Sequence, residues 1–203
     1  MALPAADLSP LTRFLIRVLL WLPVCFFGWI LLAPSVIWLC AVSVNAALLW
    51  ALPSLIERVA SEGLAISVWT NVAGTPSTQV STGYVLFDVN PLKYAYGQPL
   101  YTALVLATPA QKARQLGLWL VGIFVLLALQ VFGVSMEIVK VLAFDVNDAS
   151  RLGLGLAHLG YEIVALAYQL GYLLFPAAAP VILWLAQFRH RLPDIIGEAA
   201  RID

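Results

Sequence analysis

Residues 115–136 read QLGLWLVGIFVLLALQVFGVSM, and this run contains no charged side chain. An α-helix needs about 20 mostly apolar residues to cross the hydrocarbon core of a bilayer, so the run is long enough to span a membrane. The rest of the chain has the same character, since 62% of its 203 residues are hydrophobic and only 11% are charged. A soluble domain carries roughly 25% charged residues. The sequence therefore predicts an integral membrane protein.

Four more apolar stretches flank this run and set the expected number of membrane crossings. The stretches at about 11–33 and 156–188 are long enough to cross. The stretch at about 35–55 is apolar but is bracketed by two prolines, and the stretch at about 94–110 is short and contains a Gln-Pro pair. The first stretch exceeds the roughly 7–15 apolar residues of a removable signal peptide, so we expect it to remain as a signal anchor.

Only the part of the chain at about 57–93 has a composition typical of a water-soluble segment. Its segments LAISVWTNV (64–72) and TQVSTGYVLFDV (78–89) are rich in β-branched and aromatic residues, and AGTPS (73–77) between them is typical of a turn. We therefore expect a β-hairpin at about 63–88. A two-stranded hairpin is only marginally stable alone, so it should pack on the membrane surface, on the neighbouring helix or on a partner.

Pairs of basic residues predict the orientation, because cytoplasmic loops carry an excess of Lys and Arg. The pairs precede the first span, separate the third and fourth stretches, and follow the last span: Arg13 and Arg17, Lys112 and Arg114, Arg189 and Arg191. Placing all of them in the cytoplasm requires an even number of crossings between residues 17 and 112, so either the second or the third stretch does not cross. The prolines of the second stretch and the tyrosines of the third favour a periplasmic hairpin. A cytoplasmic hairpin stays open as the alternative.

The predicted fold class is an all-α multi-spanning membrane protein with about four transmembrane helices, one membrane-associated helix and a small β-hairpin. One membrane domain takes in residues 1–203. Its expected elements are spans at about 11–33, 94–110, 115–136 and 156–188, an interfacial or re-entrant helix at about 35–60, and the hairpin at about 63–88. We expect the protein in a bacterial inner membrane, with both termini in the cytoplasm.

Polar side chains form stripes in the last two spans, and an ionisable group in a spanning helix is by default a functional hypothesis. The polar residues recur at steps of three, four or seven, which places them on one face of each helix: Gln130, Glu137 and Lys140 in one, His158, Glu162 and Gln169 in the other. Since the helices are antiparallel, we expect these stripes and Arg151 of the connecting loop to meet near the outer face. Three interpretations stay open: a polar seam that orients the helices, a contact for a partner, and acid–base chemistry.

The remaining polar residues argue against several classes of function. Eleven basic residues balance eleven acidic ones and form no basic run, which argues against nucleic-acid binding. Cys25 and Cys40 lie inside apolar stretches without the spacing of a metal site, and the sequence contains no Gly-rich phosphate loop or calcium loop. We therefore expect no catalytic residue, cofactor or metal site.

The most distinctive segment is VNPLKYAYGQPLYTALVLA, from Val89 to Ala107. Together with QVFGVSMEIVKVLAF (130–144) and RFLIRVLLWLP (13–23), it resembles the exosortase-H-associated membrane proteins. The residues that carry the motif are Asn90, Pro91, Lys93, Tyr94, Tyr96, Gly97 and Pro99, while Gln98 stands where the resemblance implies an apolar residue. The resemblance implies a small multi-spanning inner-membrane protein of Gram-negative bacteria, encoded with an exosortase that processes proteins bearing a C-terminal sorting signal. It implies no catalytic residues.

The leading hypothesis is a non-catalytic accessory of a membrane protein-sorting system, whose partners are the lipid bilayer and an exosortase or its sorted substrate. The first alternative is a membrane enzyme of the transpeptidase or protease type. Exosortases use Cys, Arg and His near the outer membrane face, and Cys40, Arg151 and His158 are the candidates here. No base stands beside Cys40 in the sequence, which argues against this reading. The second alternative is a subunit of a transporter complex.

Overall fold

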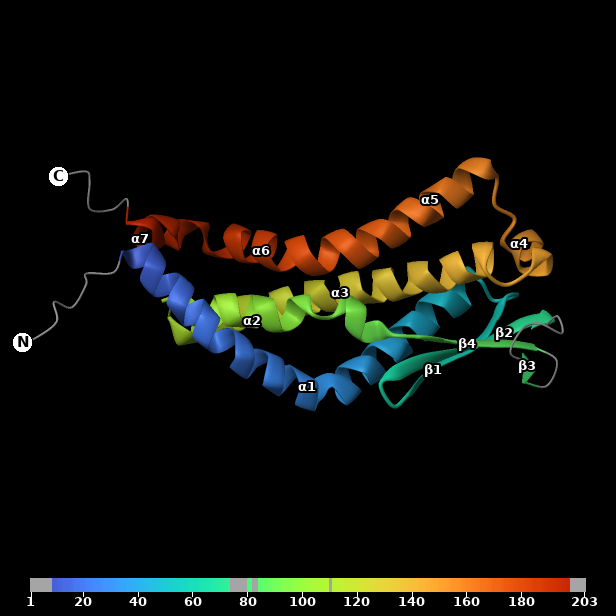
Figure 1. The fold of residues 1–203 in the computed structure, drawn as a ribbon, viewed down its shortest axis with the longest axis horizontal. Helices are drawn as coiled ribbons and strands as arrows, with labels where there is room; N and C mark the ends of the chain where they lie inside the picture. The colour runs from blue at the N-terminus through green and yellow to red at the C-terminus, as the bar shows by residue number, and fades with distance from the viewer. Residues whose placement is uncertain (1–8, 74–79, 82–83, 110, 198–203) are drawn as a thin grey trace, which may run out of the picture.

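The computed structural model describes residues 9–73, 80, 81, 84–109 and 111–197. Three helices in it are long and apolar enough to cross a membrane: α1 (Pro10–Ala51), α3 (Lys112–Phe144) and the helix His158–Arg191 (Figure 1). The last is built from α5 (His158–Gln169), a π-helical turn η2 (Leu170–Leu174), α6 (Phe175–Phe188) and a 3₁₀ turn η3 (Arg189–Arg191). The predicted helical membrane protein is confirmed. The expected count of four spans is not, because the described residues hold three candidates.

α1 joins the first two apolar stretches, so the prediction of a separate membrane-associated helix at about 35–60 is wrong. The helix continues through Pro34 to Ala51, and a strand then begins at Ile56. Proline removes one intrahelical hydrogen bond and bends a helix, and Figure 1 shows α1 bending near its middle. The helix persists because apolar residues beyond Pro34 are buried against the rest of the chain: Ile37, Cys40, Ala41, Val44 and Leu48.

The third apolar stretch, expected to span at about 94–110, forms two short helices: the 3₁₀ turn η1 (Pro91–Tyr94) and α2 (Gly97–Ala107). The 11 residues of α2 measure about 16 Å, roughly half the thickness of a hydrocarbon core. Its end is set by Pro109, which disfavours a helical conformation at the preceding residue. In Figure 1, α2 runs from the middle of the bundle to the end where both termini lie, and there α3 begins. This short helix therefore returns the chain without a full-length span.

The water-soluble segment forms an antiparallel sheet in the order β1-β2-β4-β3, with strands β1 (Ile56–Glu62), β2 (Ala65–Ala73), β3 (Val80–Ser81) and β4 (Tyr84–Val89). β2 and β4 pair as the predicted hairpin, and residues 74–77 of the predicted turn lie outside the described residues. β1 was not predicted, because the preceding helix was expected to extend to about residue 60. Gly63, with a φ of 64°, makes the tight turn between β1 and β2. The added strand supports the hairpin.

The bundle has two different ends, which we call the termini end and the sheet end. The termini end holds the starts of α1 and α3 together with α7 (Leu192–Ile196), which packs against α1. The sheet end holds the sheet and α4 (Asp148–Leu154). The three basic pairs of the sequence all fall in segments at the termini end (Figure 1). Between the first two pairs the chain therefore runs away from that end once and returns to it once, which agrees with the charge pattern.

An apolar core lies at each end. At the sheet end, α1, the strands and α3 share a core that includes Ile37, Val68 and Ile138. At the termini end, Phe14 of α1 stacks on Trp184 of α6 with ring centres 5.2 Å apart. The Trp184 Nε1–H donates a hydrogen bond to Thr108 Oγ1 at 2.8 Å, directly after α2. The short helix α2 is thus fixed to the long helices that surround it.

Two glycines permit a close approach of η1, α3 and η2. A Cβ on Gly133 of α3 would lie 2.5 Å from the ring of Tyr94, and a Cβ on Gly171 would lie 2.9 Å from the Cα of Gly133. The three elements therefore meet where no larger side chain fits.

The π turn arises where Pro176 cannot donate a backbone hydrogen bond to Tyr172, four residues earlier.

Candidate functional site

Polar side chains gather where η1 and α2 insert between the long helices. We call Trp29, Lys93, Tyr94, Gln98, Gln130 and Glu137 the central polar cluster. Gln130 is only 1% exposed. Its Oε1 accepts a hydrogen bond from Gln98 Nε2 at 2.9 Å, and its Nε2 donates to the Pro91 carbonyl at 3.4 Å. Gln98 Oε1 in turn accepts from Trp29 Nε1 at 3.3 Å. These bonds join α1, η1, α2 and α3 and satisfy the buried amides.

Glu137 forms the other half of the cluster and contacts two residues of η1. Its carboxylate makes an ion pair with Lys93 Nζ and accepts a hydrogen bond from the Tyr94 hydroxyl at 2.9 Å. The Glu137 and Lys93 side chains are 13% and 30% exposed, so salt screens the pair less than a surface pair. Lys93 Nζ also lies 5.7 Å from the centre of the Tyr172 ring, within cation–π range. Lys93 thus connects η1 to α3 and to η2.

The family-like motif shapes this inserted segment. The Asn90 side chain accepts a hydrogen bond from the backbone N–H two residues later, at 3.0 Å, and so caps η1. Pro91 follows at the first position of the turn, where its fixed φ is favourable. A Cβ on Gly97 would lie 2.6 Å from a carbonyl oxygen of α6, so only glycine allows α2 to begin there. Pro99 is buried, and Tyr96 is 37% exposed.

Lys140 and Arg151 stabilise the C-terminal end of α3. Lys140 Nζ lies 2.5 Å from Asp145 Oδ2. Arg151 Nε donates to the Ala143 carbonyl at 3.0 Å, and its Nη2 donates to the Phe144 carbonyl at 3.2 Å. Carbonyls in the last turn of a helix have no partner inside it, so the guanidinium caps α3.

The polar residues of α5 face away from the bundle. The His158 and Glu162 side chains are 93% and 59% exposed, with Nδ1 and Oε1 3.5 Å apart, and Gln169 is exposed as well. The two polar stripes therefore do not meet as we expected. The stripe of α3 faces η1 inside the bundle, whereas that of α5 faces outward.

Tyrosines take the inward face of α5. Tyr161 packs edge-on against Phe144 of α3 with ring centres 5.8 Å apart, and Lys140 Nζ lies 5.9 Å from the centre of the Tyr168 ring. Large aromatic side chains gain more from burial than His, Glu or Gln, which would lose hydration. This difference explains why α5 turns its tyrosines toward α3 and its polar residues outward.

An exposed apolar stripe runs beside these outward polar residues. Its members follow a spacing of four, three and four residues, are 43–64% exposed, and are called here the α5 stripe: Leu159, Ile163, Leu166 and Leu170. This spacing keeps them on one face of the helix and is the spacing of helix–helix contacts. On the side of the polar residues, a cavity of about 350 Å³ between the end of α3 and α5 is lined by Phe144, His158, Tyr161, Glu162 and Ala165.

The residues of the catalytic alternative lie in three different environments. Cys40 is fully buried in the core at the sheet end. Arg151 caps α3, and the His158 side chain is 93% exposed. Within the ranges that the structure describes, no three His, Cys, Asp or Glu residues are placed to hold a metal ion.

Gln130 and Glu137 were predicted to be functional polar residues, but their pairing with Gln98, Lys93 and Tyr94 was not predicted. In the sequence Gln98 is a polar residue in an otherwise apolar stretch, and Trp29 lies among apolar residues. The available signal was that an amide in an apolar run must find a hydrogen-bond partner. Because the central polar cluster is occupied by contacts within the chain, it can anchor the inserted segment. The outward polar residues of α5 are exposed and therefore accessible to a partner.

We predict that Glu137→Gln destabilises the isolated protein by about 1–3 kcal/mol, because it leaves the Lys93 ammonium partly buried without its counter-charge while an oxygen remains for Tyr94. The fraction folded in mild detergent as temperature rises measures the effect. Glu162→Gln is the matched control, and its exposed position predicts a change within about 0.5 kcal/mol. Equal stability of the two variants would show that the ion pair does not anchor η1.

Comparison with protein families supplies the context for this geometry. The model of the exosortase H-associated membrane protein family matches residues 8–191, which takes in every helix and strand named above except α7. No curated protein and no solved structure matches the chain. The resemblance noted around Val89–Ala107 is therefore confirmed over most of the sequence. The chain belongs to the family of exosortase H-associated membrane proteins.

Proposed function

We propose that this protein is a non-catalytic accessory of an exosortase-type sorting system in the inner membrane of a Gram-negative bacterium, and that it binds the exosortase or its sorted substrate through the outward face of α5. The family name associates such proteins with exosortase H. The observation that carries the proposal is the exposed α5 stripe beside the His158–Glu162 pair.

The helix that bears this stripe is longer than a bilayer requires. His158–Arg191 has 34 residues and measures about 51 Å, against about 30 Å for the hydrocarbon core. A tilt of ~20° shortens its vertical span only to about 48 Å. With Arg189 at the membrane surface, roughly the 20 residues before it fill the core, and α5 extends beyond it. Apolar side chains exposed there face neither lipid nor their own chain, which is typical of a surface for a protein partner.

The composition of this face favours a helix as the partner element. Heptad-like spacing of Leu159, Ile163 and Leu166 suits packing against a second helix. His158 and Glu162, directly beside the stripe, offer hydrogen bonds and charge that fix the register of such a pair. We therefore assign the partner-contact role to the polar residues of α5 and the helix-orienting role to Gln130 and Glu137.

Charge supports the orientation that this function needs. The three basic pairs share the termini end, and basic residues favour the cytoplasmic side. Both termini then lie in the cytoplasm, while the sheet and the start of α5 lie on the periplasmic side. In this arrangement α5 would meet an exosortase that carries its reacting Cys, Arg and His near the same outer face.

Two observations support a non-catalytic role. A nucleophilic thiol must reach its substrate, and Cys40 is 0% exposed inside the sheet-end core. Arg151 makes its hydrogen bonds to the last carbonyls of α3. The accessory role therefore uses surfaces of this chain, and the covalent chemistry belongs to its partner.

The first test removes the apolar side chains of the α5 stripe. Leu159→Ala/Ile163→Ala/Leu166→Ala should lower the amount of exosortase that co-purifies from native membranes in mild detergent by tenfold or more, because central apolar side chains carry much of the energy of an interface. The stability of the isolated variant should match that of the wild type, since the three side chains are more than half exposed.

The matched control changes exposed apolar residues of α6 inside the hydrocarbon region: Val181→Ala/Ile182→Ala/Leu185→Ala. This variant should retain the complex. The proposed docking face would be contradicted if the α5 variant co-purified as much exosortase as the wild type. It would also be contradicted if both variants lost exosortase equally.

The second test concerns catalysis. In cells that carry the sorting system, deletion of this protein should impair substrate processing, and Cys40→Ala should restore it to within about twofold of the wild type once protein levels are matched. Removal of a nucleophile costs several orders of magnitude in rate, so loss of processing at a normal protein level would make the protein an enzyme. Normal processing in the deletion strain would argue against the accessory role itself.

A further inference from the structure

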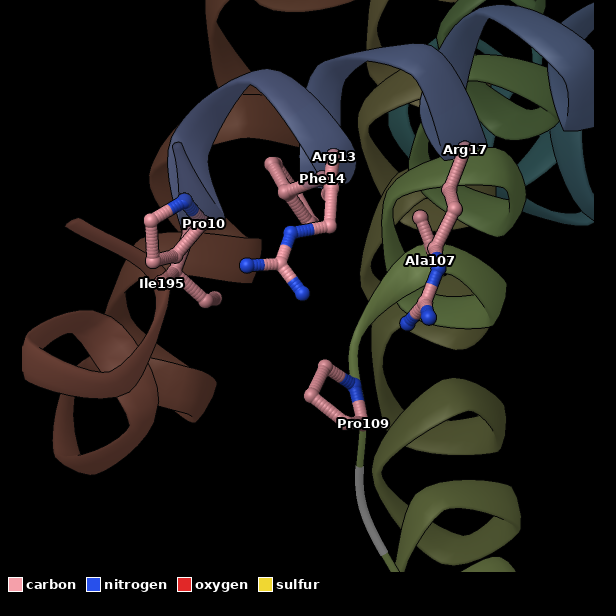
Figure 2. A pocket seen from close by; sticks show the side chains of 7 residues that line it. All are labelled: Pro10, Arg13, Phe14, Arg17, Ala107, Pro109 and Ile195. Atoms are coloured by element: carbon pink, nitrogen blue, oxygen red, sulfur yellow. The ribbon is translucent and has the colours of Figure 1, made fainter. Parts of the chain in front are cut away.

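A pocket of about 300 Å³ opens at the termini end between the start of α1, the residues that follow α2, and α7 (Figure 2). It is lined by Pro10, Arg13, Phe14, Arg17, Ala107, Pro109 and Ile195. The apolar members give it hydrophobic walls, and Phe14 and Ile195 belong to the buried core of this end. Among the described residues that line it, the two arginines are the charged ones. The proposed accessory function does not use this pocket.

The two arginines line the same pocket from one helix. They stand four residues apart on α1, which brings them to the same face of the helix. In Figure 2, the Arg13 guanidinium projects into the space between α1 and Pro109, and the Arg17 side chain extends from the same side of α1 toward Ala107. Arg13 also has an interaction within the chain. A guanidinium has five N–H donors in a planar fork, so it can serve that contact and a phosphate at once.

The surroundings favour an anion further. By sequence, residues 1–17, 108–115 and 189–203 together carry seven Lys or Arg residues and four acidic residues, so basic residues are in excess. Such clusters on the cytoplasmic side of spanning helices attract anionic headgroups. The pocket therefore lies in a positive field at the level where headgroups are expected under the proposed orientation.

The same face of α1 offers a path for acyl chains. Steps of three and four residues lead from Arg17 to Leu20 and Val24, which are 68% and 57% exposed. A molecule with an anionic head in the pocket and an apolar tail along Leu20 and Val24 would satisfy both regions. We propose that this pocket binds the phosphate of an anionic phospholipid, held by Arg13 and Arg17, with its acyl chain along α1.

The test titrates phosphatidylglycerol into the purified full-length protein in a neutral detergent and reads the shift of the thermal unfolding midpoint. A ligand that binds the folded state raises this midpoint with concentration, which yields an apparent Kd. Phosphatidylcholine and inorganic phosphate are titrated in parallel. We expect saturable stabilisation by phosphatidylglycerol alone. Equal stabilisation by inorganic phosphate would overturn the lipid as occupant, and equal stabilisation by phosphatidylcholine would overturn the anionic site.

Variants then locate the site. Each Arg near a surface phosphate contributes about fivefold in affinity, so Arg13→Gln/Arg17→Gln should weaken binding roughly thirtyfold. The control Lys112→Gln/Arg114→Gln removes the same charge from exposed positions at the same end and should change the Kd less than twofold. Equal weakening by both variants would overturn the pocket in favour of diffuse attraction. Arg13→Lys/Arg17→Lys keeps the charge and the fold but loses the planar forks, so an unchanged Kd for it would also contradict the proposal.

Discussion

The ion pair between Lys93 and Glu137 joins the inserted segment to a spanning helix, and the path of the chain depends on this contact. The segment is too short to cross a membrane as one helix, so its position must be fixed by contacts in the middle of the bundle. Glu137 holds Lys93 and Tyr94, and Gln130 holds Gln98. The cost of placing these polar groups inside the bundle is offset only if they are paired. With the segment held there, α2 returns the chain to the termini end, and the sheet and the start of α5 stay at the other.

Much of the fold could be predicted from the sequence, because apolar run length and basic residues report directly on membrane crossing. Residues 115–136 mark α3, and the basic pairs require a return between Arg17 and Lys112, which the structure supplies. The continuity of α1 could not be predicted from the sequence, because a proline such as Pro34 usually indicates the end of a helix. Here Pro34 only bends the helix. β1 was not predicted for the same reason, because the separate helix was expected to extend to about residue 60 and so to include the first part of this strand.

The candidate site was less predictable, because a polar stripe shows which residues share a face and not which way that face points. Gln130 and Glu137 point inward, as a costly polar group in a span suggests. His158 and Glu162 have the same spacing and point outward. The difference depends on Tyr161 and Tyr168, which compete for the inward face of α5 and bury more apolar surface. The pairing of Gln98 with Gln130 depends on the position of the inserted segment, η1 and α2. That position cannot be predicted from a local sequence pattern.

The placement of the two ends on opposite sides of the membrane is the central claim, and single-cysteine labelling tests it most directly. In a background with Cys25 and Cys40 replaced by Ala, Leu64→Cys lies in the turn between β1 and β2, where Leu64 is 56% exposed. Ala113→Cys lies at the termini end, between Lys112 and Arg114. With the outer membrane permeabilised, a membrane-impermeant maleimide should label Leu64→Cys in intact cells and Ala113→Cys only after the inner membrane is lysed. Labelling of Leu64→Cys only after lysis, or of both positions from the same side, would contradict the account.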